Sequence, residues 1–200
     1  LVIAVGTRLQ DFTTGSRALF ANPARQIVQI NVAPFDAHKH GAHPVVGDAR
    51  MVLEALALRL GDWRVPVGWT DAAARDVEQW NAAWEAATAP GNALPTDAQV
   101  IGALWRLASE DAVVVWAAGG LPGELHKLWR VRRVGGYHVE YGFSCMGYEI
   151  AGGLGVKLAE PSRDVFVMVG DGSYLMMNSE LATSVMLGAK LIVLLLDNRG

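Results

Sequence analysis

The sequence has very little cysteine and few charged residues. Cys145 is the only cysteine among 200 residues, so no disulfide can form within the chain, and a reducing, cytoplasmic setting fits this composition. Charged residues make up 18% of the chain and the net charge is −3, so there is no excess of positive charge with which to hold a nucleic acid. Hydrophobic residues make up 52%, which excludes a disordered chain.

Long hydrophobic runs are also missing. The apolar run at residues 191–196 is six residues long, whereas a membrane-spanning helix needs about 20. Residues 1–5 are apolar but too few for a secretion signal. We therefore expect neither a membrane nor a nucleic acid as partner. Because the chain does not begin with Met and stops directly after a strand-like run, we also expect it to be a fragment of a longer protein.

What the sequence does contain is an alternation of apolar runs and helical patterns. Strands are expected at 1–5, 27–32, 112–117, 164–169 and 191–196. Helices are expected after Asp48, over 70–87, after the capping box Thr96–Gln99, and at about 124–129, 145–159 and 175–187. Strands that alternate with helices, and that are apolar on both faces, predict an α/β fold with a mostly parallel, doubly wound sheet.

A composition break at residues 89–92 (Ala-Pro-Gly-Asn) suggests two domains. We expect residues 1–62 to be part of one α/β domain, residues 63–94 to be a linker with a helix, and residues 95–200 to be a second, truncated α/β domain.

The most informative segment is Gly170-Asp171-Gly172-Ser173, which follows a buried strand and opens a helix. Glycines allow a ligand to approach the backbone closely, and a helix N-terminus favours a phosphate. An acidic residue in such a turn would repel phosphate unless a divalent cation lies between them. Asp171 is therefore a candidate metal ligand, although an Asp before a helix can also be a simple cap.

A second strand ends at Asn198, 27 residues after Asp171. This length accommodates one helix and one neighbouring strand, and adjacent strand ends lie about 5 Å apart. Asp171 and Asn198 can therefore reach one ion. Oxygen ligands completed by phosphate and water are typical of Mg²⁺.

This arrangement resembles the signature of the thiamine-diphosphate-dependent enzymes. The resemblance implies that Mg²⁺ is held by Asp171, Asn198 and the backbone carbonyl of Gly200, and that thiamine diphosphate is bound by the turn at 170–173. It also implies a role in cofactor binding for Met146, as an apolar support beneath the rings, and for Gly119 and Gly120, as a second turn on the diphosphate side.

One branch of this family shows a similarity that extends over the whole chain. Residues 6–16, 35–50, 117–129, 137–155 and 170–183 resemble the hydrolases that open the ring of trihydroxycyclohexane-1,2-dione to 5-deoxyglucuronate in myo-inositol breakdown. The resemblance implies that residues 1–62 end a central Rossmann-like domain and that residues 95–200 begin the thiamine-diphosphate domain. It implies C–C bond cleavage with the thiazolium ring as electron sink.

The family's catalytic glutamate lies outside this chain, and it normally comes from a second subunit of a homodimer or tetramer. The fragment alone is therefore expected to be inactive. His138 and Glu140 are possible contacts to the cyclic dione substrate, or they could instead satisfy buried backbone groups.

Several plainer interpretations remain beside these. Met146 could be ordinary core filling. The run His38, His40 and His43 is interpreted as a solvated loop rather than a metal site. Cys145 is expected to be a reduced core thiol, and Glu149 a helix-surface or interface charge. The seven tryptophans suggest large buried contacts, either in the core or at a subunit interface.

Two alternative functions stay open. The chain could belong to another thiamine-diphosphate enzyme, such as an acetohydroxyacid synthase or a glyoxylate carboligase. It could also be a non-catalytic module that binds a diphosphate.

Overall fold

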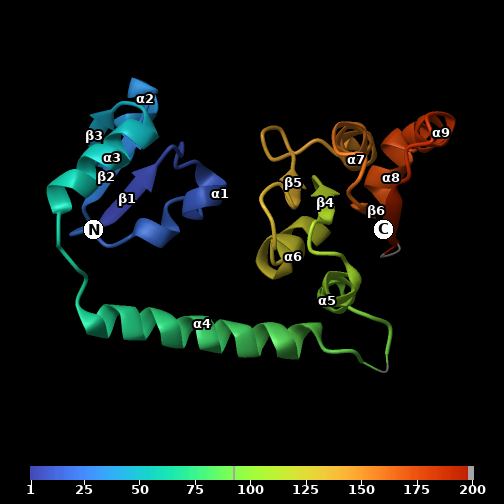
Figure 1. Cartoon of the computed structure of the whole chain (residues 1–200), viewed down its shortest axis with the longest axis horizontal. Helices are drawn as coiled ribbons and strands as arrows, with labels where there is room; N and C mark the ends of the chain where they lie inside the picture. The colour runs from blue at the N-terminus through green and yellow to red at the C-terminus, as the bar shows by residue number, and fades with distance from the viewer. Residues whose placement is uncertain (92, 198–200) are drawn as a thin grey trace. The chain divides into compact units, whose positions relative to one another are not determined.

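The computed structural model describes residues 1–91 and 93–197 (Figure 1). The chain divides into two compact units, Leu1–Thr70 and a second unit that begins at Asp71. Both units contain parallel sheets, which confirms the predicted α/β class.

The first unit is built on a three-stranded parallel sheet in the order β1-β2-β3. The strands are β1 (Val2–Val5), β2 (Ile27–Asn31) and β3 (His43–Val46). The helices are α1 (Asp11–Thr14), α2 (Pro34–Ala37) and α3 (Ala49–Leu60), with 3-10 turns at Ala18–Phe20 and Lys39–Gly41. Asp48 caps α3 by accepting a hydrogen bond from Met51 N at 3.1 Å, as predicted, although no residue of α3 is buried.

The histidine run is not one loop. His43 opens β3 and pairs with Val28 of β2, so the loop interpretation is wrong for this residue. His38 Nδ1 lies 2.8 Å from Pro34 O, and His40 Nε2 lies 2.8 Å from Leu9 O. Both rings therefore hydrogen-bond to backbone carbonyls of their own unit.

The long helix α4 (Val67–Thr88) follows, close to the predicted range. Of its apolar positions, Trp84 is 1% exposed, whereas Trp80 is 47% exposed and Val77 is 59% exposed. Trp84 is thus a core residue as expected, whereas Trp80 is exposed in the single chain, and its place in a subunit interface stays a prediction.

The second unit contains a four-stranded parallel sheet in the order β5-β4-β6-β7. Its strands are β4 (Val113–Trp116), β5 (Tyr137–Val139), β6 (Val165–Gly170) and β7 (Ile192–Leu196). Its helices are α5 (Asp97–Leu107), α6 (Leu121–Leu128), α7 (Tyr148–Ala159), α8 (Asp171–Met177) and α9 (Ser179–Met186). The single helix expected at 175–187 is therefore two helices, the first of which begins directly at Asp171.

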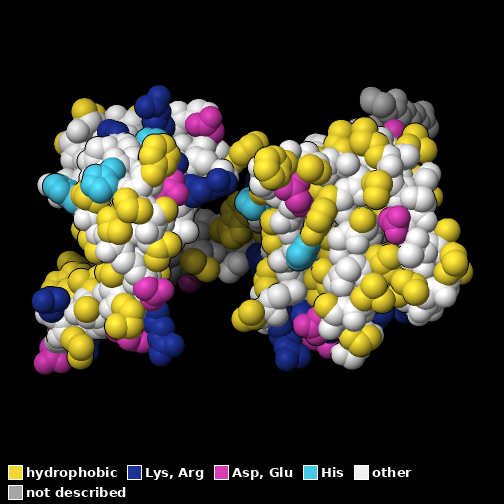
Figure 2. All heavy atoms as spheres, turned by 90° about the horizontal axis from the view of Figure 1, so that it is seen from above, with side chains coloured by type: hydrophobic (Ala, Val, Ile, Leu, Met, Phe, Trp, Pro, Cys, Tyr) yellow, Lys and Arg dark blue, Asp and Glu magenta, His cyan; other side chains and the backbone are white. Residues whose placement is uncertain are grey.

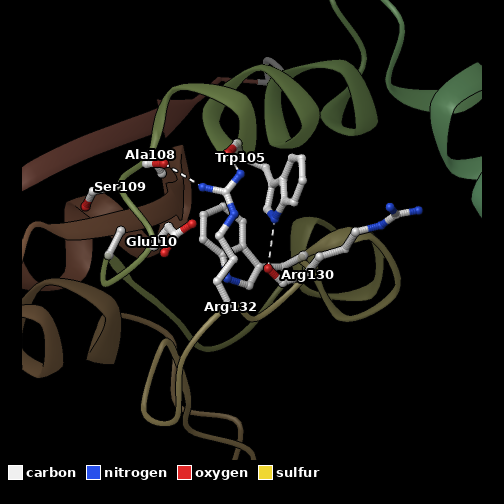
Figure 3. Close-up of a pocket in the computed structure, with 8 residues that line it drawn as sticks. Trp105, Ala108, Ser109, Glu110, Arg130 and Arg132 are labelled. Carbon is white, nitrogen blue, oxygen red and sulfur yellow. Dashed lines mark hydrogen bonds between the residues drawn. The ribbon is translucent and has the colours of Figure 1, made fainter.

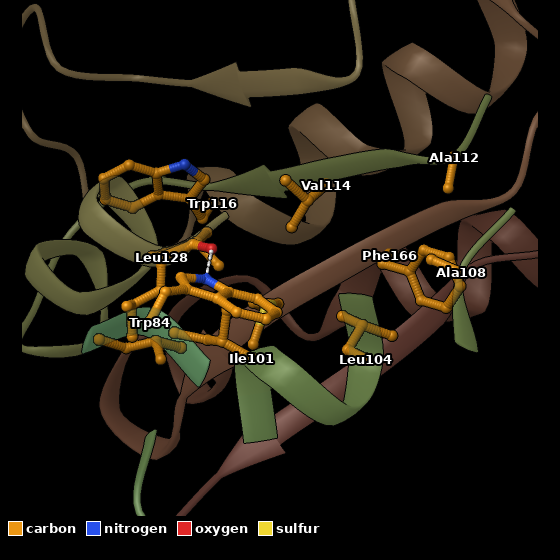
Figure 4. Packing of buried hydrophobic residues seen from close by; sticks show 12 residues of the cluster. Trp84, Ile101, Leu104, Ala108, Ala112, Val114, Trp116, Leu128 and Phe166 are labelled. Carbon is orange, nitrogen blue, oxygen red and sulfur yellow. Dashed lines mark hydrogen bonds between the residues drawn. The ribbon is translucent and has the colours of Figure 1, made fainter. Parts of the chain in front are cut away.

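Helices cover both faces of this sheet, so it is doubly wound as predicted (Figure 1). On one face, α4, α5 and α6 pack against alternate strand residues, namely Val114, Trp116, Phe166 and Met168 (Figure 4). On the other face, α7 and the segment of α8 and α9 pack against the residues between them, namely Val113, Val115, Val165, Val167 and Val169. This two-sided burial explains why the strands are continuously apolar.

Many large hydrophobic side chains remain on the surface. Figure 2 shows them spread over the visible faces of both units. On α8 and α9 they include Leu175, Val185 and Met186, which are 71%, 80% and 85% exposed. No helix in the described part of the chain is long and apolar enough to cross a bilayer.

Candidate cofactor site

The order of the strands creates a crevice at one end of the second sheet. β5 lies on one side of β4 and β6 lies on the other, so the loop after β4 leads to α6 on one face while the loop after β6 leads to α8 on the opposite face. In open α/β sheets, ligands bind at such a switch point, beyond the carboxyl ends of the strands.

A cavity of about 820 Å³ lies at this place, within the size range of pockets for cofactors. It is lined by seven of the predicted cofactor residues: Gly119, Gly120, Met146, Gly170, Asp171, Gly172 and Ser173. The structure therefore brings together three segments that are far apart in the sequence. The other two predicted residues, Asn198 and Gly200, lie outside the described residues.

Asp171 is the first residue of α8 and is half-buried in the cavity wall. The cap position belongs to Gly170, whose backbone is extended (φ −77°, ψ 161°). Asp171 is therefore not the helix cap that the plainer interpretation allowed. Ser173, 3% exposed, completes the first turn, so the start of the helix and an acidic side chain meet at one cavity wall.

The charge of the cavity is one-sided. Its described lining includes Asp97, Asp171 and Asp197, and no lysine, arginine or histidine. These carboxylates would repel an anionic ligand alone. A divalent cation between the ligand and the carboxylates would attract both and so remove this repulsion. No group of three or more His, Cys, Asp or Glu side chains in the described ranges could hold a metal by itself. Phosphate oxygens and further oxygen ligands would have to complete the coordination, as Mg²⁺ commonly requires.

Met146 lines the cavity and is 45% exposed, so it is not a core residue. A Cβ atom added to Gly172 would lie 3.4 Å from Met146 Cε, which places the thioether methyl next to the turn before α8. The next residue, Gly147, has φ +92°, and a Cβ there would lie 2.7 Å from Met177 Cγ. The backbone that carries Met146 is thus tightly packed against α8.

His138 and Glu140 do not line the cavity. His138 Nε2 lies 2.5 Å from Tyr148 Oη, and the two rings are stacked with 7° between their planes. Glu140 accepts hydrogen bonds from Cys145 N at 2.6 Å and from Phe143 N at 2.8 Å, and these bonds lower the pKa of Glu140. Their role as substrate contacts stays a prediction.

Two expectations near the cavity are wrong. Cys145 is exposed rather than a core thiol, because it lies in the loop that Glu140 organises from outside the sheet. Glu149 is 1% exposed rather than a surface charge, because its carboxylate turns back toward the backbone of two loops.

Sequence reasoning also missed part of the lining. Leu94, Pro95, Asp97 and Val100, around the start of α5, face the cavity. The capping box at Thr96 locates this helix, but nothing in the local pattern shows that its N-terminal end meets the loops after β4, β6 and β7.

Two family descriptions match the chain. Residues 1–56 match the "Thiamine pyrophosphate enzyme, central domain", and residues 117–200 match the "Thiamine pyrophosphate enzyme, C-terminal TPP binding domain". The second match begins at the end of β4 and includes every segment of the cavity except the region around the start of α5.

Curated relatives are similar over the entire chain. The 3D-(3,5/4)-trihydroxycyclohexane-1,2-dione hydrolases of Geobacillus thermodenitrificans (strain NG80-2) and Clostridium perfringens (strain 13 / Type A) are 44% and 39% identical to it. The hydrolase of the same name from Bacillus cereus (strain AH820) is 42% identical. All of the chain is aligned with each of them, but it spans only 34–35% of their length. The two matched domains, found in the expected order, show that the chain belongs to the thiamine pyrophosphate enzyme family.

Proposed function

We propose that the chain is part of a thiamine-diphosphate-dependent hydrolase that cleaves a C–C bond in trihydroxycyclohexane-1,2-dione and gives 5-deoxyglucuronate, a step of inositol breakdown. The observation that carries this proposal is the cavity at the switch point of the second sheet. There the Gly119-Gly120 turn, Met146 and the turn at residues 170–173 meet around three aspartates. The identity to named hydrolases supports the choice of substrate.

In this proposal the residues of the cavity divide the work by their chemistry. The carboxylate of Asp171 would hold Mg²⁺, together with Asn198 and the Gly200 carbonyl, and the cation would offset the negative charge of the cavity wall toward a diphosphate. Gly119, Gly120 and Gly172 let the backbone approach the cofactor, because they have no Cβ. The Met146 thioether supports the rings, since it is flexible and polarizable.

Thiamine diphosphate, when bound, supplies a nucleophilic ring carbon and an electron sink for the breaking C–C bond. The protein's part is to orient the cofactor in the cavity. The proposed partner is a second subunit of a homodimer or tetramer that contributes the activating glutamate. His138 and Glu140 are proposed contacts of the dione.

The test is a binding titration of the full-length protein with thiamine diphosphate, with and without Mg²⁺. We expect binding to require Mg²⁺. Asp171→Asn should weaken it by about 100-fold, the loss of roughly 3 kcal/mol that is typical of removing one partner of a shielded charge pair. Asp164→Asn is the matched control, because Asp164 directly precedes the opposite end of β6, away from the cavity, and its only described ion pair is a 3.7 Å contact with Lys190.

Substrate assays separate the proposal from its alternatives. The full-length protein should open the cyclic dione and leave pyruvate unchanged. Turnover of pyruvate in place of the dione would favour a synthase or carboligase. Tighter binding of ADP or NAD than of thiamine diphosphate would indicate a non-catalytic diphosphate-binding module.

A further inference from the structure

Glu149 is a buried carboxylate that the proposed cofactor chemistry does not use. It is the second residue of α7 and is 1% exposed. Its Oε2 accepts a hydrogen bond from Gly147 N at 2.9 Å, and its Oε1 accepts one from Ala118 N at 3.3 Å. These two backbone amides are 29 residues apart in the sequence, and each lies in a loop that borders the cavity.

The energetics of burial explain why a carboxylate fits this position. A buried charge is costly unless hydrogen bonds and favourable dipoles compensate it. Glu149 receives two backbone hydrogen bonds, and its place in the first turn of α7 puts it at the positive end of the helix dipole. In the described ranges it is the one charged side chain that is buried. It also has no lysine, arginine or histidine partner there, so its interactions are with the backbone.

The two amides belong to two separate segments that border the cavity. Ala118 precedes Gly119 and Gly120 in the turn after β4, and Gly147 follows Met146. Gly147 is held from the other side by α8, where a Cβ would clash with Met177. One carboxylate thus ties the turn after β4 to the backbone that presents Met146, and through Gly147 to α8.

We propose that Glu149 is a positioning residue, which sets the separation of the 118–120 turn and Met146 and so prepares the cavity for the cofactor. This inference rests on the proposed function, in which both segments contact thiamine diphosphate. Each oxygen of the Glu149 carboxylate receives one of the two amides. A Gln side chain keeps the size of Glu149 but turns an NH₂ group toward one of the two N–H donors.

The test compares the full-length protein with Glu149→Gln by titration with thiamine diphosphate at saturating Mg²⁺. We expect the Kd for the cofactor to rise about tenfold, as for the loss of one hydrogen bond to a charged group. At saturating cofactor, kcat should fall while the KM for the dione stays within about twofold, because Glu149 is buried and does not line the cavity.

Arg132→Gln is the matched control. Arg132 also uses a charged side chain to tie two backbone groups together, donating to Ala108 O at 2.7 Å and to Trp105 O at 3.0 Å (Figure 3). These carbonyls lie outside the cavity. Arg132→Gln should therefore lower the melting temperature without changing the Kd of the cofactor.

A second measurement uses the wild-type protein alone, so it does not require that a variant folds. In the cofactor-free wild-type protein, the amides of Ala118 and Gly147 should exchange their hydrogens at least tenfold more slowly than the amides of Gly119 and Gly120. Among the described residues, the N–H groups of Gly119 and Gly120 have no hydrogen-bond acceptor. Fast exchange at Ala118 and Gly147 would overturn the inference, as would a Glu149→Gln Kd equal to that of wild type or changed no more than in Arg132→Gln. A wild-type protein that binds no thiamine diphosphate at all would overturn the proposed function, and this inference with it.

Discussion

Gly153 of α7 lies directly on Val167 of β6. A Cβ added to Gly153 would lie 2.4 Å from Val167 Cγ2, and Val167 is fully buried in a cluster with Ile150 and Val169. A glycine inside a helix costs about 1 kcal/mol relative to alanine, so its presence here reflects the close approach of helix and strand. This contact fixes where α7, and therefore the Met146 loop at its start, lies over the sheet.

We expect Gly153→Ala to lower the free energy of unfolding by about 1–3 kcal/mol, because the methyl group overpacks a site with no room for it. Thermal unfolding of the wild-type protein and of the variant would measure this change in the free energy of unfolding. Gly155→Ala is the control in the same helix, because a Cβ there meets nothing within 4 Å. That variant should be stabilised by about 0.5–1 kcal/mol, and a similar loss in both variants would contradict the packing argument.

Met146 provides a prediction about the cofactor. If its thioether supports the rings, Met146→Ala should raise the Kd for thiamine diphosphate several-fold, the effect of about 1 kcal/mol of lost contact. Its half-exposed position means that stability should change by less than about 1 kcal/mol. The control is Met186→Ala, which removes an 85% exposed methionine of α9 that does not line the cavity. Its Kd for thiamine diphosphate, measured by the same titration, should equal that of the wild-type protein.

The fold could be predicted where the burial is two-sided. β4, β6 and β7 are continuous apolar runs because helices cover both faces of the sheet. β3 and β5 were missed because these edge strands contain polar or strand-breaking residues, such as Pro44 in β3 and His138 in β5, which an edge tolerates. Local patterns alone do not distinguish such strands from loops. The edge strands β1 and β7 are apolar runs, and they were predicted.

The candidate site, like the fold, could be predicted from the sequence only in part. The turn at Asp171 is visible in the sequence because its glycines, acid and helix start are consecutive. The places of Asp97 in the cavity lining and of Glu149 between two loops that border the cavity were not visible, because they depend on packing between distant segments. Glu149, for example, accepts a hydrogen bond from an amide 31 residues earlier in the chain. Contacts of this kind have no local signature.

Trp84 packs α4 against the core of the second unit. Its indole Nε1 donates to Leu128 O at 2.7 Å (Figure 4), its ring packs edge-on against Trp105, and the Arg130 guanidinium lies 4.0 Å from its ring centroid. Trp84→Phe should lower the free energy of unfolding by about 2–4 kcal/mol, since it leaves a cavity and an unsatisfied buried carbonyl.

The control for this change is Trp69→Phe in the same helix. Trp69 is 66% exposed, so the variant should stay within about 0.5 kcal/mol of wild type. Denaturant unfolding, followed by far-ultraviolet circular dichroism, would measure both. Equal stability of Trp84→Phe and Trp69→Phe would show that α4 is not held by this contact.

Glu140 should make its loop sensitive to acid. The amides of Cys145 and Phe143 lower the pKa of Glu140 in the folded protein, below the value of about 4.3 for an unfolded chain. The folded state therefore gains stability from the ionised carboxylate above about pH 4.3, and this gain is lost as the pH falls through the lowered pKa.

Amide exchange of Phe143 and Cys145, relative to intrinsic rates, should rise in this acidic range, whereas the Leu154 amide within α7 stays protected. In Glu140→Gln the two loop amides should exchange faster already at neutral pH and show no such acid transition. An unchanged loop in that variant would mean that the carboxylate does not order residues 140–145.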